Sequence, residues 1–105
     1  MKLPPHSRYP KSILVKDEQY SVQMRTRIGG TKTTATVGEC DSCDHVIRVL
    51  KSQSKEELFS TFIHELLHAS SDEYDIKLTH RQVYKLERAI AQILLNNFIT
   101  QYEKY

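Results

Sequence analysis

The chain has 105 residues, enough for one domain with a modest core but not for a second lobe. Its 15 basic and 13 acidic residues nearly balance and are scattered along the chain, so the composition indicates neither a nucleic-acid partner nor a membrane partner. The N-terminal residues contain no apolar run typical of a signal peptide, and no segment is long enough to span a bilayer. We therefore expect a cytoplasmic protein that acts as a monomer.

The first half of the sequence predicts a small sheet that follows an extended arm. Residues 1–12 form this N-terminal arm, because three prolines restrict its backbone, and a single domain covers residues 13–105. β-branched residues or a two-residue alternation of apolar side chains indicate the strands. They are expected at residues 13–15, 19–28, 31–37 and 45–50, with a Gly29-Gly30 turn after the second strand and a tight loop at 38–45.

Helical signals replace the strand signals in the second half. Ser54 is a good N-cap and Glu57, three residues later, completes a capping box, so a helix is predicted over residues 55–74. Thr79 and Gln82 repeat this pattern and open a second helix that continues to about residue 102. The expected fold class is α+β, with a small antiparallel sheet of three or four strands followed by an antiparallel pair of long helices.

The motif His64-Glu65-Leu66-Leu67-His68 lies in the middle of the first predicted helix. Histidines four residues apart stand on one face of a helix, one turn apart, so both imidazoles can bind one Zn²⁺. Glu65 lies beside them and can hold a metal-bound water and accept its proton. The spacing therefore predicts a zinc site with His64 and His68 as ligands and Glu65 as the general base.

A catalytic zinc usually takes a third protein ligand besides a water, and the second predicted helix offers Glu87. Glu87 projects from the middle of an apolar stripe, where a carboxylate is costly unless it is paired or binds a metal. A hairpin of the two helices also brings Glu87 level with the turn of the second histidine. Asp72 and His80 are alternative ligands. The alternative role of Glu87 is a buried salt bridge to Arg25, Arg27 or Arg48, or a hydrogen bond to a tyrosine.

Cys40 and Cys43 offer a different zinc site. With the two histidines they give the pattern C-x₂-C-x₂₀-H-x₃-H, which has the residue types of a structural zinc site but a longer gap than the usual one of about 12 residues. In that arrangement Glu65 has no chemical role, and the protein is a non-catalytic zinc-containing binding module. The interpretation we favour for the cysteines is a loop that joins two strands.

These motifs resemble those of a known group of enzymes. The stretch from Gly38 to Ala91 is similar to the short zincin-like HExxH metallopeptidases of bacteria and phages, among them the ImmA/IrrE and SprT-like groups and minimal gluzincins. The matching segments are Val46–Val49, Thr61–Ala69, Asp72-Glu73-Tyr74 and Leu78-Thr79. The chain lacks the NExxxD motif of standard gluzincins and the extended HExxHxxGxxH motif of metzincins.

The resemblance implies a minimal zincin-like fold, an edge strand at residues 45–50 that pairs with an extended substrate, and a glutamate ligand at the place of Glu87. The expected function is zinc-dependent hydrolysis of peptide bonds in a protein or peptide substrate, with Tyr84 or His80 as a candidate to stabilise the oxyanion. By analogy alone, that substrate is a host or phage regulatory protein. A further alternative is a protein-binding module on the same scaffold that holds zinc without turnover.

Overall fold

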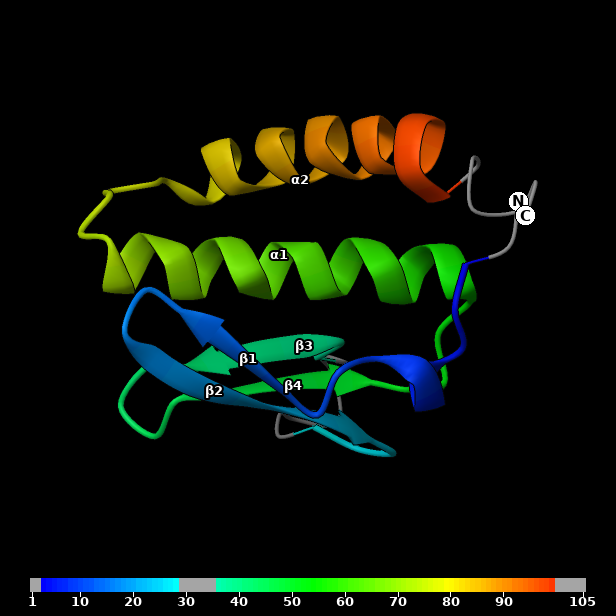
Figure 1. The fold of residues 1–105 in the computed structure, drawn as a ribbon, viewed down its shortest axis with the longest axis horizontal. Coiled ribbons are helices and arrows are strands. Elements are labelled where there is room, and N and C mark those ends of the chain that lie inside the picture. Colours follow the sequence, from blue (N-terminus) through cyan, green and yellow to red (C-terminus); the bar gives the residue numbers. More distant parts are fainter. Residues whose placement is uncertain (1–2, 29–35, 100–105) are drawn as a thin grey trace.

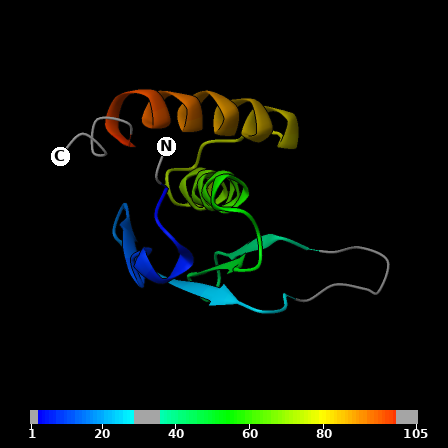
Figure 2. The ribbon, with the colours of Figure 1, turned by 90° about the vertical axis from the view of Figure 1, so that its right-hand side faces the viewer.

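A computed structural model describes residues 3–28 and 36–99, without the side chains of the last two. This part of the chain forms a four-stranded sheet and two helices, α1 (Lys55–Glu73) and α2 (His80–Leu94), stacked in layers (Figure 1). Figure 2 looks along α1 and shows that this helix lies between the sheet and α2. The α+β class predicted from the sequence is confirmed. None of the helices in the described ranges is both long and apolar enough to cross a membrane.

The sheet is mixed, which corrects the expectation of a purely antiparallel one. Its strands are β1 (Ser12–Val15), β2 (Glu18–Arg25), β3 (Gly38–Asp41) and β4 (Val46–Leu50), in the spatial order β1-β2-β4-β3. The hairpins β1–β2 and β3–β4 are antiparallel, but β2 and β4 pair in parallel, with Val22 opposite Ile47. Alternation of apolar residues identifies a strand but carries no information on its direction, and the long connection through β3 permits a parallel pair.

Two further strand predictions were wrong. The segment expected to be a tight loop at 38–45 contains β3, and only its second half forms the turn to β4. The strand expected at 45–50 is β4, but it is an inner strand between β2 and β3, so it is not the edge strand that we predicted. β3 occupies that edge instead. The turn expected at Gly29-Gly30 and residues 31–35 of the strand expected at 31–37 lie outside the described residues, and the last two residues of that strand, Thr36 and Val37, are not in a strand.

Both helices begin where their capping signals predict. The Ser54 side chain accepts a hydrogen bond from the Glu57 N–H, Thr79 does the same for Gln82, and both capping boxes are complete. A short π-helix, Leu95–Ile99, continues α2, and its predicted end near residue 102 lies outside the described residues. The helix pair is therefore present, although α2 has only 15 residues before the π-helix.

The core lies between α1 and the inner strands. Tyr20, Ile47 and Val49 of the sheet are completely shielded from solvent and pack in one cluster with Leu58 and Phe62 of α1. This packing fixes which face of α1 is turned to the sheet and leaves the opposite face for α2.

The N-terminal arm covers one end of this core. It is less extended than expected, because it contains a short 3₁₀ turn, His6–Arg8. Leu3 and Tyr9 are buried, and the Tyr9 ring meets the Phe62 ring edge to face, with centroids 5.1 Å apart. The arm is therefore part of the folded unit, since aromatic burial of this kind contributes to stability.

Candidate active site

The two motif histidines lie side by side on α1, as the spacing predicts. His64 Nε2 and His68 Nε2 are 3.1 Å apart, and the ring centroids are 4.8 Å apart. Two nitrogen ligands of a tetrahedral zinc at 2.0–2.1 Å would be roughly 3.3 Å from each other. The histidine pair therefore has the donor atoms and the spacing that suit two ligands of one zinc ion.

The environment of His68 favours the neutral form that a metal requires. Burial lowers the pKa of His68, and the neighbouring imidazoles of His64 and His80 lower it further, whereas Asp72 opposes the shift. A ring that is neutral at physiological pH offers a lone pair to a metal without first losing a proton.

Glu65 is the buried carboxylate of the site, with only 6% of the residue exposed. Burial raises its pKa to about 7, and the nearby carboxylates of Glu39 and Glu87 contribute to the shift. A carboxyl group with a pKa near neutrality can both accept and return a proton, which is the property that a general base in hydrolysis needs.

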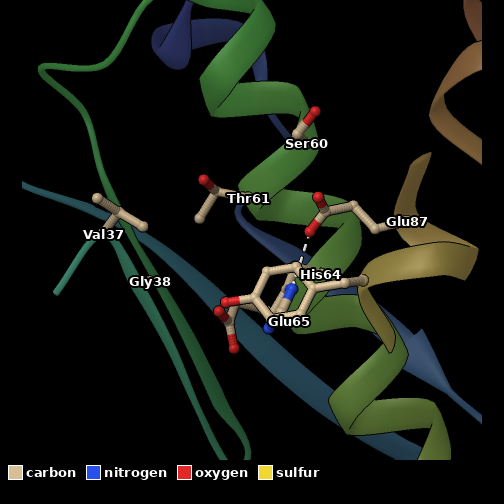
Figure 3. Close-up of a pocket in the computed structure, with 8 residues that line it drawn as sticks. Val37, Gly38, Ser60, Thr61, His64, Glu65 and Glu87 are labelled. Atoms are coloured by element: carbon tan, nitrogen blue, oxygen red, sulfur yellow. Dashed lines mark hydrogen bonds and ion pairs between the residues drawn. The ribbon is translucent and has the colours of Figure 1, made fainter. Parts of the chain in front are cut away.

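A cavity of about 260 Å³ opens beside these residues, between the start of β3, α1 and α2. Figure 3 shows Val37 and Gly38 on one side of it and α1 with Ser60, Thr61 and His64 on the other. Glu65, Tyr84 and Glu87 complete the lining. Tyr84, a predicted oxyanion candidate, is exposed, and its ring lies 4.9 Å from the His64 ring between centroids.

Glu87 reaches the site from α2, but on the other edge of His64. Its Oε1 atom lies 2.8 Å from His64 Nδ1, as the dashed line in Figure 3 marks. Neither of these side chains is more than 15% exposed. Among the arginines considered as partners of Glu87, Arg48 pairs instead with Glu39 at 2.8 Å. The contact with Nδ1 turns the carboxylate away from the point between the two Nε2 atoms. The structure therefore does not show Glu87 in the position of a ligand, and its predicted ligand role stays a prediction.

The alternative third ligands, His80 and Asp72, also lie near the histidine pair, but neither forms a three-residue metal site with it. The His80 ring lies 5.4 Å from the His68 ring between centroids, and Asp72 accepts a hydrogen bond from Ser42. Within residues 3–28 and 36–99, no three side chains of His, Cys, Asp or Glu are arranged to hold a metal ion. The residues therefore fit zinc in part: two imidazoles have a suitable spacing, and a third donor would have to turn toward them.

The two cysteines are free thiols in different environments. Cys40 is on β3, half-buried against the core, whereas Cys43 is exposed in the turn to β4, as the loop interpretation predicted for it. Asp41 Oδ1 shapes this turn by accepting hydrogen bonds from the N–H groups of Cys43 and Asp44, both at 3.0 Å. Burial raises the pKa of Cys40 to about 11, which disfavours its thiolate.

Sequence reasoning did not identify two residues that shape the site from β3. A Cβ atom on Gly38 would lie 2.6 Å from Thr61 Cγ2 and 2.9 Å from Glu65 Oε2, so only glycine allows this approach of strand and helix. Glu39 contributes its charge to the environment of Glu65. A glycine that opens a strand is a known signal of close backbone approach, and it could have indicated Gly38 had β3 been recognised.

A separate set of polar contacts lies at the C-terminal end of α1, away from the cavity. The Tyr20 hydroxyl donates to Glu73 Oε2 at 2.5 Å, and His45 Nε2 is 3.6 Å from the same oxygen. Burial, followed by this hydrogen bond, raises the pKa of Tyr20. These contacts tie the C-terminal turn of α1 to the sheet, and sequence reasoning did not predict them.

No protein-family model, curated protein or solved structure matches the chain.

Proposed function

We propose that the protein is a zinc-dependent peptidase in which His64 and His68 bind the metal and Glu65 is the general base. The observation that carries the proposal is the convergence of two imidazole Nε2 atoms at 3.1 Å beside a buried carboxylate in the wall of a cavity. This combination provides a metal site, a proton acceptor and space for a substrate within one turn of a helix.

The third ligand belongs to α2, which carries Glu87 against His64 and His80 against His68. A bound zinc would polarise the scissile carbonyl and lower the pKa of a water molecule. The imidazoles are suited to hold it, because the lowered pKa of His68 keeps that ring neutral.

Glu65 holds and moves the proton. With a pKa near 7 it can take a proton from the attacking water and donate it to the leaving amine in the same cycle. The cavity beside Glu65 gives the scissile bond access to this carboxylate, and Tyr84 lies where its hydroxyl can turn toward the substrate carbonyl.

The edge of β3 is the proposed binding site for an extended peptide. β3 is the outer strand of the sheet on the side of the cavity, and Val37 and Gly38 at its start line the cavity with His64 and Glu65. An extended peptide can add to such an edge through backbone hydrogen bonds, which would lay its scissile bond along α1. We expected β4 to bind the peptide, but β4 is an inner strand, so we assign peptide binding to β3.

The test is cleavage of a mixed peptide library by the zinc-loaded protein, with the products identified by mass spectrometry. We expect the wild type to cleave and Glu65→Gln to lose about 10²–10⁴ of the rate while it retains its zinc, because the amide cannot accept the proton. Glu18→Gln is the matched control, since Glu18 is exposed on β2 and does not line the cavity. Equal cleavage by wild type and Glu65→Gln would contradict the proposal. A zinc-loaded wild type that cleaves nothing would favour a binding module.

A further inference from the structure

The contact between Glu87 and His64 carries a further inference, which rests on the proposed function. The Glu87 carboxylate comes from α2 and meets the imidazole from α1 with 2.8 Å between Oε1 and Nδ1. Both side chains are largely shielded from water, at 15% exposure each. A hydrogen bond with a charged partner in such surroundings is stronger and more directional than one on an open surface.

The geometry of the imidazole ring separates this contact from the metal point. Nδ1 and Nε2 lie on different edges of the ring, and Nε2 of His64 faces Nε2 of His68 at 3.1 Å. A carboxylate engaged by Nδ1 is therefore turned away from the point at which the two Nε2 atoms meet. In the arrangement observed, Glu87 cannot bind a metal at that point while it keeps its bond to His64.

The chemistry of the bond also fixes the proton on the ring. An ionised carboxylate only accepts hydrogen bonds, so the hydrogen in this contact belongs to His64 Nδ1. A neutral histidine that carries its hydrogen on Nδ1 has a lone pair on Nε2, and in the metal-free protein this lone pair accepts the hydrogen of His68 Nε2 at 3.1 Å. Both contacts favour the same tautomer of His64, and Glu87 holds the ring orientation in which His64 can act as a ligand once His68 releases that hydrogen.

We propose that Glu87 is a positioning residue that acts through His64 Nδ1, and not the third metal ligand. Outer partners of this kind raise the basicity of a histidine ligand and keep it aligned. This role leaves His80 as the α2 side chain available to the metal, since its ring already lies against that of His68.

The first test reads the tautomer of His64 in the metal-free protein by ¹⁵N NMR of its ring nitrogens, with His68→Ala in every sample so that the Nε2 contact to His68 cannot fix the tautomer, and with the signal assigned from a His64→Gln variant. We expect the chain that keeps Glu87 to carry its hydrogen on Nδ1 and Glu87→Ala to shift toward the Nε2–H form common in free histidine. Glu87→Gln should lie between them, because an amide oxygen can still accept from Nδ1. The same tautomer with Glu87 and with Glu87→Ala would overturn the proposal. This readout needs no metal, so it remains decisive even if the zinc peptidase proposal fails.

The second test uses Co²⁺ alone as the probe. For a positioning residue we expect Glu87→Ala to weaken Co²⁺ binding about 10–100-fold, Glu87→Gln to recover most of it, and the visible absorption bands of the bound ion to stay in place. Loss of a ligand would instead change the band positions in both variants, and this result would overturn the proposal. Glu18→Gln serves as the surface control. If His64→Ala binds Co²⁺ as well as the wild type does, the site proposed for the enzyme is wrong, whatever the role of Glu87.

Discussion

The buried carboxylate of Glu65 lowers the stability of the folded protein, although we propose that it has a chemical role. It is one of two buried polar residues in the described part of the chain, and it lies near the carboxylates of Glu39 and Glu87. Burying a carboxylate among other acidic groups destabilises its ionised form. Such an arrangement is typical of residues retained for function and not for stability.

We therefore expect Glu65→Gln to stabilise the metal-free protein by about 1–2 kcal/mol at pH 8. The pKa of Glu65 is raised from 4.5 to about 7, so the folded state takes up a proton that the unfolded state does not hold between these values. The free energy of unfolding of the wild type should fall as the pH rises through this window. Urea unfolding at pH 5 and pH 8 checks this, and a Gln variant less stable than the wild type at pH 8 would contradict it.

The two cysteines should differ strongly in reactivity. Cys43 is exposed, whereas burial raises the pKa of Cys40 to about 11. At pH 8 this raised pKa keeps the Cys40 thiol protonated, and the thiolate is the reactive form. We expect iodoacetamide to modify the folded Cys40→Ser variant at least ten times faster than Cys43→Ser, as followed by mass spectrometry. Equal rates in the folded state would show that Cys40 is not held as described, and both thiols should react alike in urea.

At the level of elements, the site depends on how closely β3 approaches α1. Gly38 pairs with Val49 in the sheet and faces Thr61 and Glu65 of the helix. The absence of a side chain lets the Glu65 carboxylate lie against the strand that we propose as the peptide-binding edge. The position of the general base is thus set by the spacing of two elements as well as by its own helix.

Gly38→Ala should disturb both stability and the site. Its Cβ atom would lie 2.6 Å from Thr61 Cγ2 and 2.9 Å from Glu65 Oε2, so strand, helix or side chain must shift. Overpacking of this kind costs about 1–3 kcal/mol. Chemical denaturation measures the loss, and Gly38→Ala combined with Thr61→Ser tests its origin, because Ser lacks the crowded methyl group. No recovery in the double variant would contradict the steric explanation, and Thr61→Ser alone is the control.

The elements differ in how far the sequence determined them. Ser54 with Glu57 and Thr79 with Gln82 located both helix starts, because a cap is a local interaction between neighbouring residues. The pairing of β2 with β4 joins strands far apart in the sequence, and the alternation of apolar residues does not indicate which strands pair. The relative direction of these strands and the identity of the edge strand were therefore predicted wrongly. β3 was mistaken for a loop because its four residues contain little of the β-branched pattern that marks a strand.

At the scale of the whole molecule, α1 is the central layer, which packs against the sheet on one side and against α2 on the other (Figure 2). Its Leu58 and Phe62 belong to the core cluster shared with the sheet, and its His64 and His68 contact Glu87 and His80 of α2. This arrangement explains why the periodicity of α1 sufficed to place the histidine pair and Glu65. The exact contact of Glu87 could not be predicted, because it depends on the axial shift and rotation of α2, which no local pattern records.

The measurement that tests the central claim most directly is the zinc stoichiometry of purified variants, determined by titration calorimetry with ZnCl₂. We expect one zinc per wild-type chain, a loss of binding in His64→Ala and His68→Ala, and full binding in the double variant Cys40→Ser/Cys43→Ser. Binding should also raise the melting temperature, since a ligand present at 100 times its Kd stabilises the folded state by about 2.7 kcal/mol. A wild type that binds no zinc, or a cysteine variant that loses it, would contradict a metal centre built on the histidine pair.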